Sequence, residues 1–272
     1  MNSVVHIEIL KKACREVYNK TRDLIGTNEG NRKLGIGAGG DWSRKIDIEA
    51  ENAVISTIKK YNFSPTIIGE ECGRIVGDEK GFLIMDALDG TTNASMGLPF
   101  YCCSLAYALG FKLSSVLHAT VIDLITGDIY SASKNRGAYM NEDKIHVGTL
   151  NRLDHELLIG MNISRSSTSQ LKVLSNLISL TDHARLLGAN ALELCYLAKG
   201  SLDAYVDLRG KIRATDMAAA YLIVRESGGS IYSSVDGAIL DSELEVNSRM
   251  SFIAVANDDI YNRISKTIAA SI

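Results

Sequence analysis

Residues 67–93 read IIGEECGRIVGDEKGFLIMDALDGTTN, and the chemistry that the sequence predicts rests on this stretch. A short apolar strand runs into Glu70 and Glu71, and a second strand, FLIM, runs into Asp86, with Asp89 three residues later. Crowding carboxylates at the ends of two apolar strands is unfavourable, because like charges repel and burial removes their hydration. A divalent cation relieves both effects, and oxygen-only ligands favour Mg²⁺.

The next residues, Gly90-Thr91-Thr92-Asn93, predict a helix start beside these acids. Glycine allows tight backbone approach, and if Asp89 or its neighbour caps a helix there, the free N–H groups of residues 90–92 form an anion site. A cation site beside a helix N-terminus suits phosphate chemistry. The alternative is an acidic loop with an aspartate cap and a turn. It explains each motif alone, but not the occurrence of both acidic motifs and the glycine-threonine segment together.

Two further acids lie near predicted helix starts. Asp216 opens the helix TDMAAAYLIVRESGG, residues 215–229, and Asp47 stands near the start of another. Each fits the cluster, but each is also explained as a capping acid. The small run Ala218-Ala219-Ala220 beside Asp216 predicts close packing of that end of the helix against other backbone.

A glycine-rich string at residues 35–40, GIGAGG, matches the GxGxxG pattern of dinucleotide-binding proteins. We reject that interpretation, because no apolar strand precedes the string and no helix follows it directly. The stretch is predicted to be a mobile loop and a candidate lid.

The remaining pattern predicts a layered α/β (α+β) fold. Apolar spacing predicts helices over 3–24 and 47–61, strands over 66–69 and 81–86, and an antiparallel meander over 101–133. After about residue 155 strands and helices alternate, with the helices over 169–180, 190–200, 215–229 and 258–272. We predict a single catalytic domain over 1–272, with subdomains of about 1–150 and 151–272.

The composition and charge of the chain exclude several classes of protein. The chain has 272 residues and a formal net charge of −3, which excludes a strongly basic surface that coats nucleic acid. Residues 66–93 hold six acidic and two basic residues, so the rest is nearly neutral. No apolar run approaches the roughly 18–20 residues that span a bilayer, and the N-terminus lacks a signal-peptide pattern. We therefore expect a cytoplasmic protein with reduced cysteines.

In order and spacing, these motifs resemble those of the inositol monophosphatase superfamily of Mg²⁺-dependent phosphatases. The family patterns GEE, D-P-[IL]-D-G-T-[TS]-N and W-D-x-A-A-x-x-L-[IV]-x-E-A-G-G correspond here to residues 69–71, 86–93 and 215–229. Ala87 replaces the usual proline and Thr215 the usual tryptophan. The resemblance runs from about residue 4 to 268 and implies an αβαβα sandwich.

Within the superfamily, two segments resemble the archaeal-type branch that combines fructose-1,6-bisphosphatase and inositol-1-monophosphatase activities. They are residues 36–52 and 184–216, although Trp42-Ser43 stands where the branch has Pro-Thr. The nucleotidase branch usually has DGTKGF after the metal loop, whereas residues 89–93 read DGTTN. The resemblance therefore favours a sugar-phosphate phosphatase.

The resemblance also implies a metal-ligand set. Glu70, Asp86 and the Leu88 carbonyl would hold one Mg²⁺, and Asp86, Asp89 and Asp216 a second. A third, weaker ion would share Glu70, and Mn²⁺ is a possible substitute. Two such metals about 4 Å apart stabilise the attacking and leaving oxygens of an in-line displacement.

The implied catalytic residues are Asp47 and Thr91, which would orient or deprotonate the attacking water, and the metal ligand Glu70. The N–H groups of Gly90 and Thr91, beside Asp89, would bind the phosphate. Arginine matches the second phosphate of a bisphosphate. The remaining substrate-binding residues implied are Arg185, Asn190, Asp207 and Arg209.

We expect direct hydrolysis of fructose-1,6-bisphosphate and/or inositol-1-phosphate by metal-activated water, within carbohydrate metabolism and gluconeogenesis. The expected partner is a small-molecule sugar phosphate, with no nucleic acid and no membrane, and the expected assembly is a homodimer. Two alternatives stay open. One is a 3′(2′),5′-bisphosphate nucleotidase on the same fold, and the other is a scaffold that binds the RNA machinery.

Overall fold

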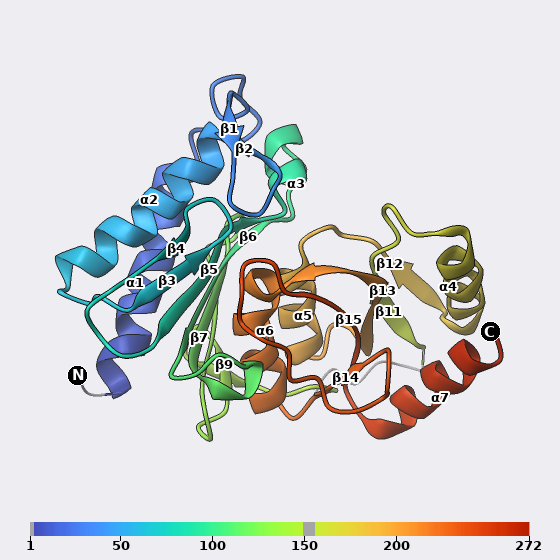
Figure 1. Cartoon of the computed structure of the whole chain (residues 1–272). Coiled ribbons are helices and arrows are strands. Elements are labelled where there is room, and N and C mark those ends of the chain that lie inside the picture. Colours follow the sequence, from blue (N-terminus) through green and yellow to red (C-terminus); the bar gives the residue numbers. More distant parts are fainter. Residues whose placement is uncertain (1–2, 149–155, 272) are drawn as a thin grey trace.

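The computed structural model describes residues 3–148 and 156–271 and has five layers, as Figure 1 shows. Two helices cover the outer face of an eight-stranded sheet, two lie between that sheet and a five-stranded sheet, and two cover the far face. This arrangement confirms the predicted αβαβα sandwich. In that order the helices are α1 (Ser3–Thr21), α2 (Lys45–Lys60), α5 (Asn190–Ala198), α6 (Ala214–Glu226), α4 (Thr168–Leu180) and α7 (Asp258–Ala269).

The eight-stranded sheet has the order β10-β9-β8-β7-β6-β5-β3-β4. Its neighbours are antiparallel except β3 and β5, so the predicted meander is confirmed. All residues of β5 after its first are buried, as a near-continuous apolar run in a sheet covered on both faces should be. The strands are β3 (Thr66–Gly69), β4 (Gly73–Ile75), β5 (Phe82–Asp89), β6 (Cys102–Ala108), β7 (Val116–Asp123), β8 (Ile129–Ser133), β9 (Ala138–Met140) and β10 (Asp143–Ile145).

The five-stranded sheet has the order β12-β11-β13-β15-β14. Strand β11 is parallel to β12 and β13, and β15 is antiparallel to β13 and β14. The alternation predicted after residue 155 is confirmed by these strands and the helices between them. The strands are β11 (Leu158–Met161), β12 (His183–Arg185), β13 (Ala204–Arg213), β14 (Ser230–Ser233) and β15 (Arg249–Val255).

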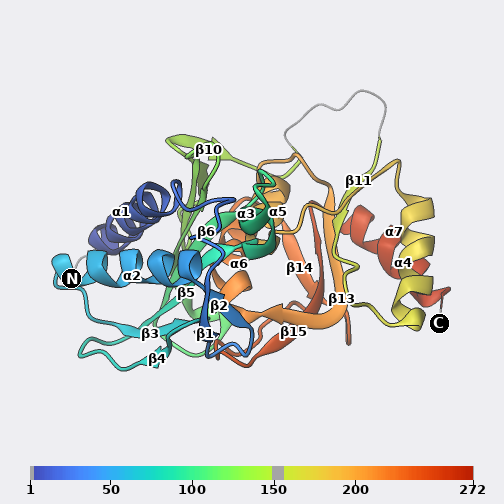
Figure 2. The ribbon, with the colours of Figure 1, turned by 90° about the horizontal axis from the view of Figure 1, so that it is seen from above.

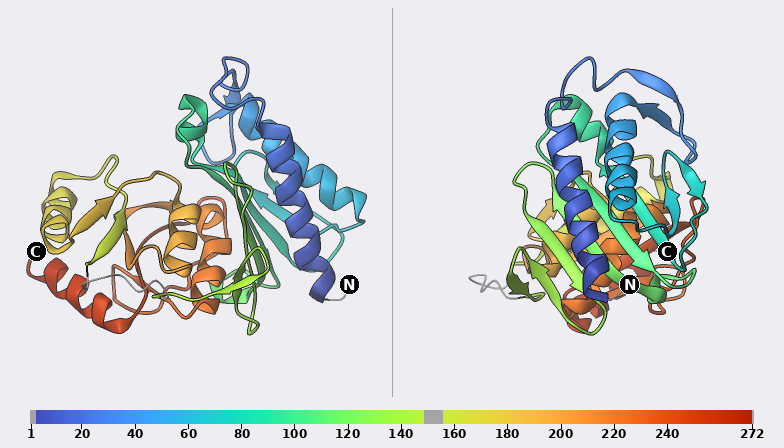
Figure 3. Two further views of the ribbon diagram at one scale, coloured as in Figure 1. Left: turned by 180° about the vertical axis from the view of Figure 1, so that it is seen from behind. Right: turned by 90° about the vertical axis from the view of Figure 1, so that its left-hand side faces the viewer.

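Helix α6 is the centre of the core. It contacts strands of the first sheet as well as α5, and Figure 2 shows it between the two sheets. Its residues from Ala214 to Val224 are all buried, the pattern of a helix enclosed on every side. Ala218–Ala220 are fully buried, which confirms the predicted close packing. On the outer face, α1 and α2 lie side by side across the first sheet, as Figure 3 shows.

Several boundaries differ from the prediction. The glycine-rich stretch predicted to be a loop contains a hairpin of β1 (Lys33–Ile36) and β2 (Trp42–Arg44), because the two flanks of its glycines pair with each other. The short helix α3 (Thr91–Met96) begins at the residues predicted to start one, and the 3₁₀ turn η1 (Leu113–Ser115) was not predicted. The predicted boundary near 150 falls outside the described residues. Among the described helices, none is long and apolar enough to span a bilayer.

Candidate active site

Three carboxylates from both halves of the chain meet at one point. Glu70 directly follows β3, Asp86 lies within β5, and Asp216 lies in the first turn of α6. One oxygen of each lies within 4.8 Å of the other two. The pairing of β5 with β6 is irregular between Asp86 and Asp89, and such an irregularity redirects side chains at a strand end.

Burial and mutual repulsion hold protons on these acids. Burial, followed by the charge of Asp216, raises the pKa of Glu70 to about 8 and that of Asp89 to about 7. Burial and the neighbouring Glu70 raise the pKa of Asp86 as well. Such a cluster ionises fully only beside a positive charge. Its all-oxygen donor set fits a hard divalent cation.

Asp47 adds an unsatisfied oxygen to this cluster. Its Oδ2 accepts a hydrogen bond from the Arg44 N–H at 2.8 Å, as a first-turn acid does. Its Oδ1 is buried and has no hydrogen-bond partner among the described residues. Burial raises the pKa of Asp47. Capping therefore accounts for one oxygen and leaves the other for a ligand.

The acids lie in a cleft of about 420 Å³ that also includes the start of α3. Gly90 precedes that helix with φ +93°, and a Cβ there would come within 3.1 Å of Ala189, Phe100 and Tyr101, so glycine is required. The Thr91 hydroxyl donates to the Leu88 carbonyl at 3.0 Å. The predicted residues that line this cleft are Asp47, Glu70, Asp86, Leu88, Asp89, Gly90, Thr91, Asn190 and Asp216.

The comparisons with known proteins agree with this geometry. The model of the inositol monophosphatase family matches residues 5–269. The chain belongs to this family. Its members are phosphatases, so the predicted phosphoric monoester hydrolase is confirmed. The family is metal-dependent, and the cluster of Glu70, Asp86 and Asp216 could bind a metal ion.

Alignments with individual relatives extend over nearly the whole of this phosphatase. The fructose-1,6-bisphosphatase/inositol-1-monophosphatase of Methanothermobacter thermautotrophicus is 33% identical over 94% of each chain. The bifunctional NADP phosphatase/NAD kinase of Methanocaldococcus jannaschii is 31% identical over 94% of this chain and 49% of its own. A crystal structure of an inositol monophosphatase–fructose 1,6-bisphosphatase has a TM-score of 0.85 at 27% identity, covering 96% of this chain and 98% of its own.

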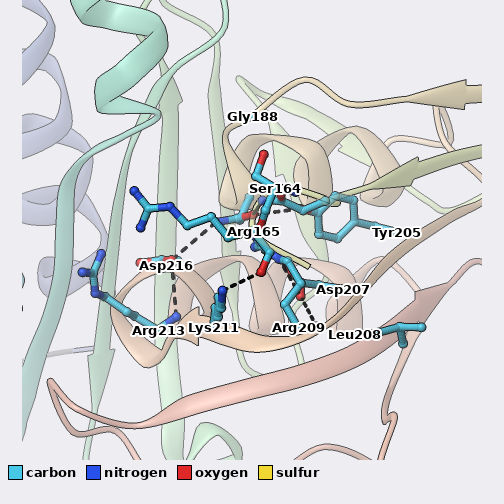
Figure 4. Close-up of polar contacts among 12 residues, drawn as sticks. Ser164, Arg165, Gly188, Tyr205, Asp207, Leu208, Arg209, Lys211, Arg213 and Asp216 are labelled. Atoms are coloured by element: carbon cyan, nitrogen blue, oxygen red, sulfur yellow. Dashed lines mark hydrogen bonds and ion pairs between the residues drawn. The ribbon is translucent and has the colours of Figure 1, made fainter. Parts of the chain in front are cut away.

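Three residues predicted to bind substrate lie outside the cleft lining. Asp207 is fully buried, and its carboxylate accepts hydrogen bonds from the Arg209 Nε at 2.9 and 3.1 Å (Figure 4). Arg209 also donates to the Ser164 carbonyl at 3.0 Å. Arg185 is exposed and donates to the Ala184 carbonyl at 2.9 Å. Their substrate roles stay predictions.

Asn190 does lie at the site. It donates to Asp216 at 3.4 Å and accepts from the Tyr205 hydroxyl at 2.8 Å. It therefore joins the C-terminal sheet to the acid cluster.

Lys33, Trp42, Arg165 and Arg213 are among the cleft-lining residues that were not predicted to belong to the site. In Figure 4 the guanidinium groups of Arg165 and Arg213 extend to the same side. Arg213 is the clearest omission, since it stands three residues before Asp216 and donates to Glu70 at 2.5 Å. A basic residue one helical turn before a predicted metal ligand was the available signal.

Proposed function

We propose that this phosphatase hydrolyses fructose-1,6-bisphosphate and/or inositol-1-phosphate with two or three Mg²⁺ ions, which Mn²⁺ can replace. The observation that carries the proposal is the meeting of Glu70, Asp86 and Asp216 oxygens within 4.8 Å. Relatives 30–33% identical are named for both activities, which supports this pair of substrates. The nucleotidase and scaffold alternatives have less support, since the ligand set is intact and these relatives are phosphatases of sugar phosphates.

The acids and one carbonyl would hold the cations, and the ligands are Glu70, Asp86, Leu88, Asp89 and Asp216. When bound, the cations supply a water of lowered pKa and neutralise the leaving oxygen. Asp47 would take the proton of the attacking water at its unpartnered Oδ1. Its raised pKa makes it a better proton acceptor than an exposed aspartate.

Phosphate would be held by the N–H groups of Gly90 and Thr91 at the start of α3. The Thr91 hydroxyl, bound to the Leu88 carbonyl, keeps that carbonyl in place beside the cluster. Lys33 and Arg165 line the same cleft, so a second phosphate of the substrate would meet positive charge there.

Phosphate release from a substrate panel tests the proposal. The panel holds fructose-1,6-bisphosphate, inositol-1-phosphate, 3′-phosphoadenosine 5′-phosphate and NADP⁺, each with Mg²⁺, Mn²⁺ or EDTA. We expect the first two to dominate, EDTA to abolish turnover and Asp89→Asn to lose at least about a thousandfold in kcat/KM. Asp236→Asn makes the same change in an exposed turn and should match wild type. Full activity of Asp89→Asn would contradict the mechanism.

A nucleotide phosphomonoester is the second candidate, and one observation favours it. The Trp42 side chain is 56% exposed and lines the cleft, so its ring is available to stack on a base. The relatives named NADP phosphatase/NAD kinase agree with such a substrate. Trp42→Ala should then lower kcat/KM for NADP⁺ or 3′-phosphoadenosine 5′-phosphate and leave fructose-1,6-bisphosphate turnover unchanged.

We also propose a cytoplasmic homodimer that acts in gluconeogenesis. Met96, the last residue of α3, and Leu98 are exposed. Leu186 is exposed next to Leu187, whose carbonyl accepts a hydrogen bond from Asn93 of α3. An apolar surface of this kind is typical of a subunit contact. Light scattering coupled to gel filtration should give twice the mass of the chain, and Leu98→Glu should give a monomer. A monomeric wild type would refute the dimer.

A further inference from the structure

The glycine-rich tip of the β1–β2 hairpin is docked on one corner of the acid cluster. The N–H groups of Ala38 and Gly39 donate to the carbonyl oxygens of Glu71 and Glu70, at 3.2 and 2.8 Å. The Ser43 hydroxyl donates to the Glu71 carboxylate. The string that matched a dinucleotide motif therefore contacts both glutamates of the GEE motif.

This contact explains two of the glycines. A Cβ on Gly37 would overlap the Glu71 carboxylate and lie 2.9 Å from the Ser43 Oγ. A Cβ on Gly39 would lie 3.0 Å from the Glu70 Cγ. A side chain at Gly37 would displace the Glu71 carboxylate, and one at Gly39 would crowd Glu70, so glycine serves close packing here.

Arg213 joins this tip to the acids. Its Nη1 donates to the Glu70 carboxylate at 2.5 Å, and its Nη2 donates to the Gly39 carbonyl at 3.2 Å and to the Asp41 carboxylate. The Arg213 side chain is only 17% exposed, whereas that of Asp41 is 64% exposed. One guanidinium therefore spans from the start of α6 to the hairpin.

The same Glu70 carboxylate belongs to the predicted cation site. A guanidinium on Glu70 and a divalent cation on the cluster are two positive charges that share one carboxylate and repel each other. Asp41 and the Gly39 carbonyl give Arg213 partners on the hairpin that do not belong to the cluster. Arg213 can therefore loosen its bond to Glu70 without losing its bonds to the tip.

We propose that Arg213 is a positioning residue that couples cation binding at Glu70 to the placement of the hairpin tip, residues 37–41, over the site. Arg213 holds the tip against Glu70 while the carboxylate is free. It gives up Glu70 when a cation shares that carboxylate, and the tip moves with Arg213 and Asp41. The inference rests on the proposed function only in taking the Glu70 cluster as a cation site.

The chain contains its own reporter of this movement. Trp42 is its single tryptophan, follows Asp41 directly, and has the Lys33 Nζ 5.0 Å from its ring centroid. Metal-stripped full-length protein is titrated with MgCl₂ while tryptophan emission and binding heat are followed. We expect a saturable emission change whose midpoint equals that of the binding isotherm.

The variants separate coupling from a merely structural role. Arg213→Met removes the competing charge and should tighten Mg²⁺ binding about fivefold or more while losing the emission change. Asp41→Asn should keep Mg²⁺ binding and lose at least half of the emission change. Arg213→Lys, which keeps the charge, should have a Mg²⁺ affinity and an emission change between those of wild type and Arg213→Met. Glu245→Gln breaks an unrelated surface pair with Arg74, at 3.7 Å, and should match wild type.

Three results would overturn the proposal. One is Mg²⁺ binding by a folded Arg213→Met variant that equals or falls below that of wild type, since a helix-start residue with only a structural role would weaken the site. Another is unchanged Trp42 emission at Mg²⁺ saturation, and the third is a wild-type response in Asp41→Asn. In each of these cases phosphatase activity with Mg²⁺ would leave the proposed function intact. Absence of both Mg²⁺ binding and turnover would refute the two together.

Discussion

Replacing Glu70 by glutamine should stabilise the cation-free protein and abolish its stabilisation by Mg²⁺. The ionised Glu70 side chain is packed against Asp216 and Asp86, and Arg213 donates a hydrogen bond to it. Glutamine keeps nearly the same volume and removes one negative charge from the cluster. A residue retained despite lowering the stability of the fold is the signature of a functional site.

The magnitude follows from the pKa. Burial and Asp216 raise the pKa of Glu70 from 4.5 to about 8. At about 1.4 kcal/mol per pKa unit the full shift corresponds to about 5 kcal/mol, most of which is present at pH 8. The side chain is 19% exposed and the variant loses the bond from Arg213, so we expect a net gain of about 2 kcal/mol. For a chain of this size that is roughly a 5 °C rise in Tm.

The pH dependence shows in which direction Glu70 changes the stability of the fold. Because the folded pKa of Glu70 lies above its unfolded value, the folded state binds more protons between pH 4.5 and about 8. The stability of the wild type in EDTA should therefore fall as pH rises through this window, and Glu70→Gln should flatten the fall. At pH 5, near the lower end of this window, most of the difference in Tm between the two proteins should be gone.

Differential scanning fluorimetry in EDTA at pH 5 and pH 8, repeated with Mg²⁺, measures the Tm of both proteins and its dependence on pH and Mg²⁺. Saturating Mg²⁺ at a hundred times Kd should add about 2.7 kcal/mol to the wild type and little to the variant. Glu142→Gln makes the same chemical change at an exposed turn and should follow the wild type. A Glu70→Gln variant less stable than wild type at pH 8 in EDTA would refute the reasoning.

Other predictions concern separate parts of the molecule. Gly37→Ala should cost about 1–3 kcal/mol of stability and lower kcat/KM, because its Cβ meets Ser43 and the Glu71 carboxylate; unchanged values would contradict the close-packing account. Asp47→Asn should lower kcat at least about a hundredfold with little change in Mg²⁺ affinity by calorimetry, and an unchanged kcat would remove Asp47 from proton transfer. Burial lowers the pKa of His118 to about 4, so its contribution, roughly 2 kcal/mol, should be lost as pH falls from 6.5 towards 4. Urea unfolding of His118→Gln should lack that acid-side loss, and a slope identical to wild type would assign it to another group.

Strongly patterned segments and local acids could be predicted from the sequence. Leu83, Ile84 and Met85 of β5 are fully buried, and the alanines of α6 pack at the centre of the molecule. The acids of the cluster lie at the ends of apolar strands and at the start of an apolar helix. Because these buried elements pack together, the hydrophobic pattern already places the acids near one another. Residues 37–41 of the glycine-rich string do form a loop, but its flanks pair as a hairpin and its tip donates backbone hydrogen bonds to Glu70 and Glu71, which the local pattern did not predict.

Long-range polar partners could not be predicted. Arg213 and Glu70 are 143 residues apart, and no local periodicity relates them. The pairing of Asp207 with Arg209 did have a local signal, because residues two apart on a strand share a face. The family resemblance instead implied a substrate-binding role for Asp207. Asp207 is fully buried and paired with Arg209, and it does not line the cleft.

The division of the acid cluster between β3, β5 and α6 has a consequence for synthesis. A growing chain that has emerged as far as β5 already carries Glu70, Asp86 and Asp89, but Asp216 arrives only with α6, the helix that both sheets enclose. The nascent N-terminal half therefore lacks one of the proposed ligands and the helix that covers the others. Because the proposed site needs Asp216, hydrolysis requires the central helix to be in place, and phosphatase activity would report a completely folded chain.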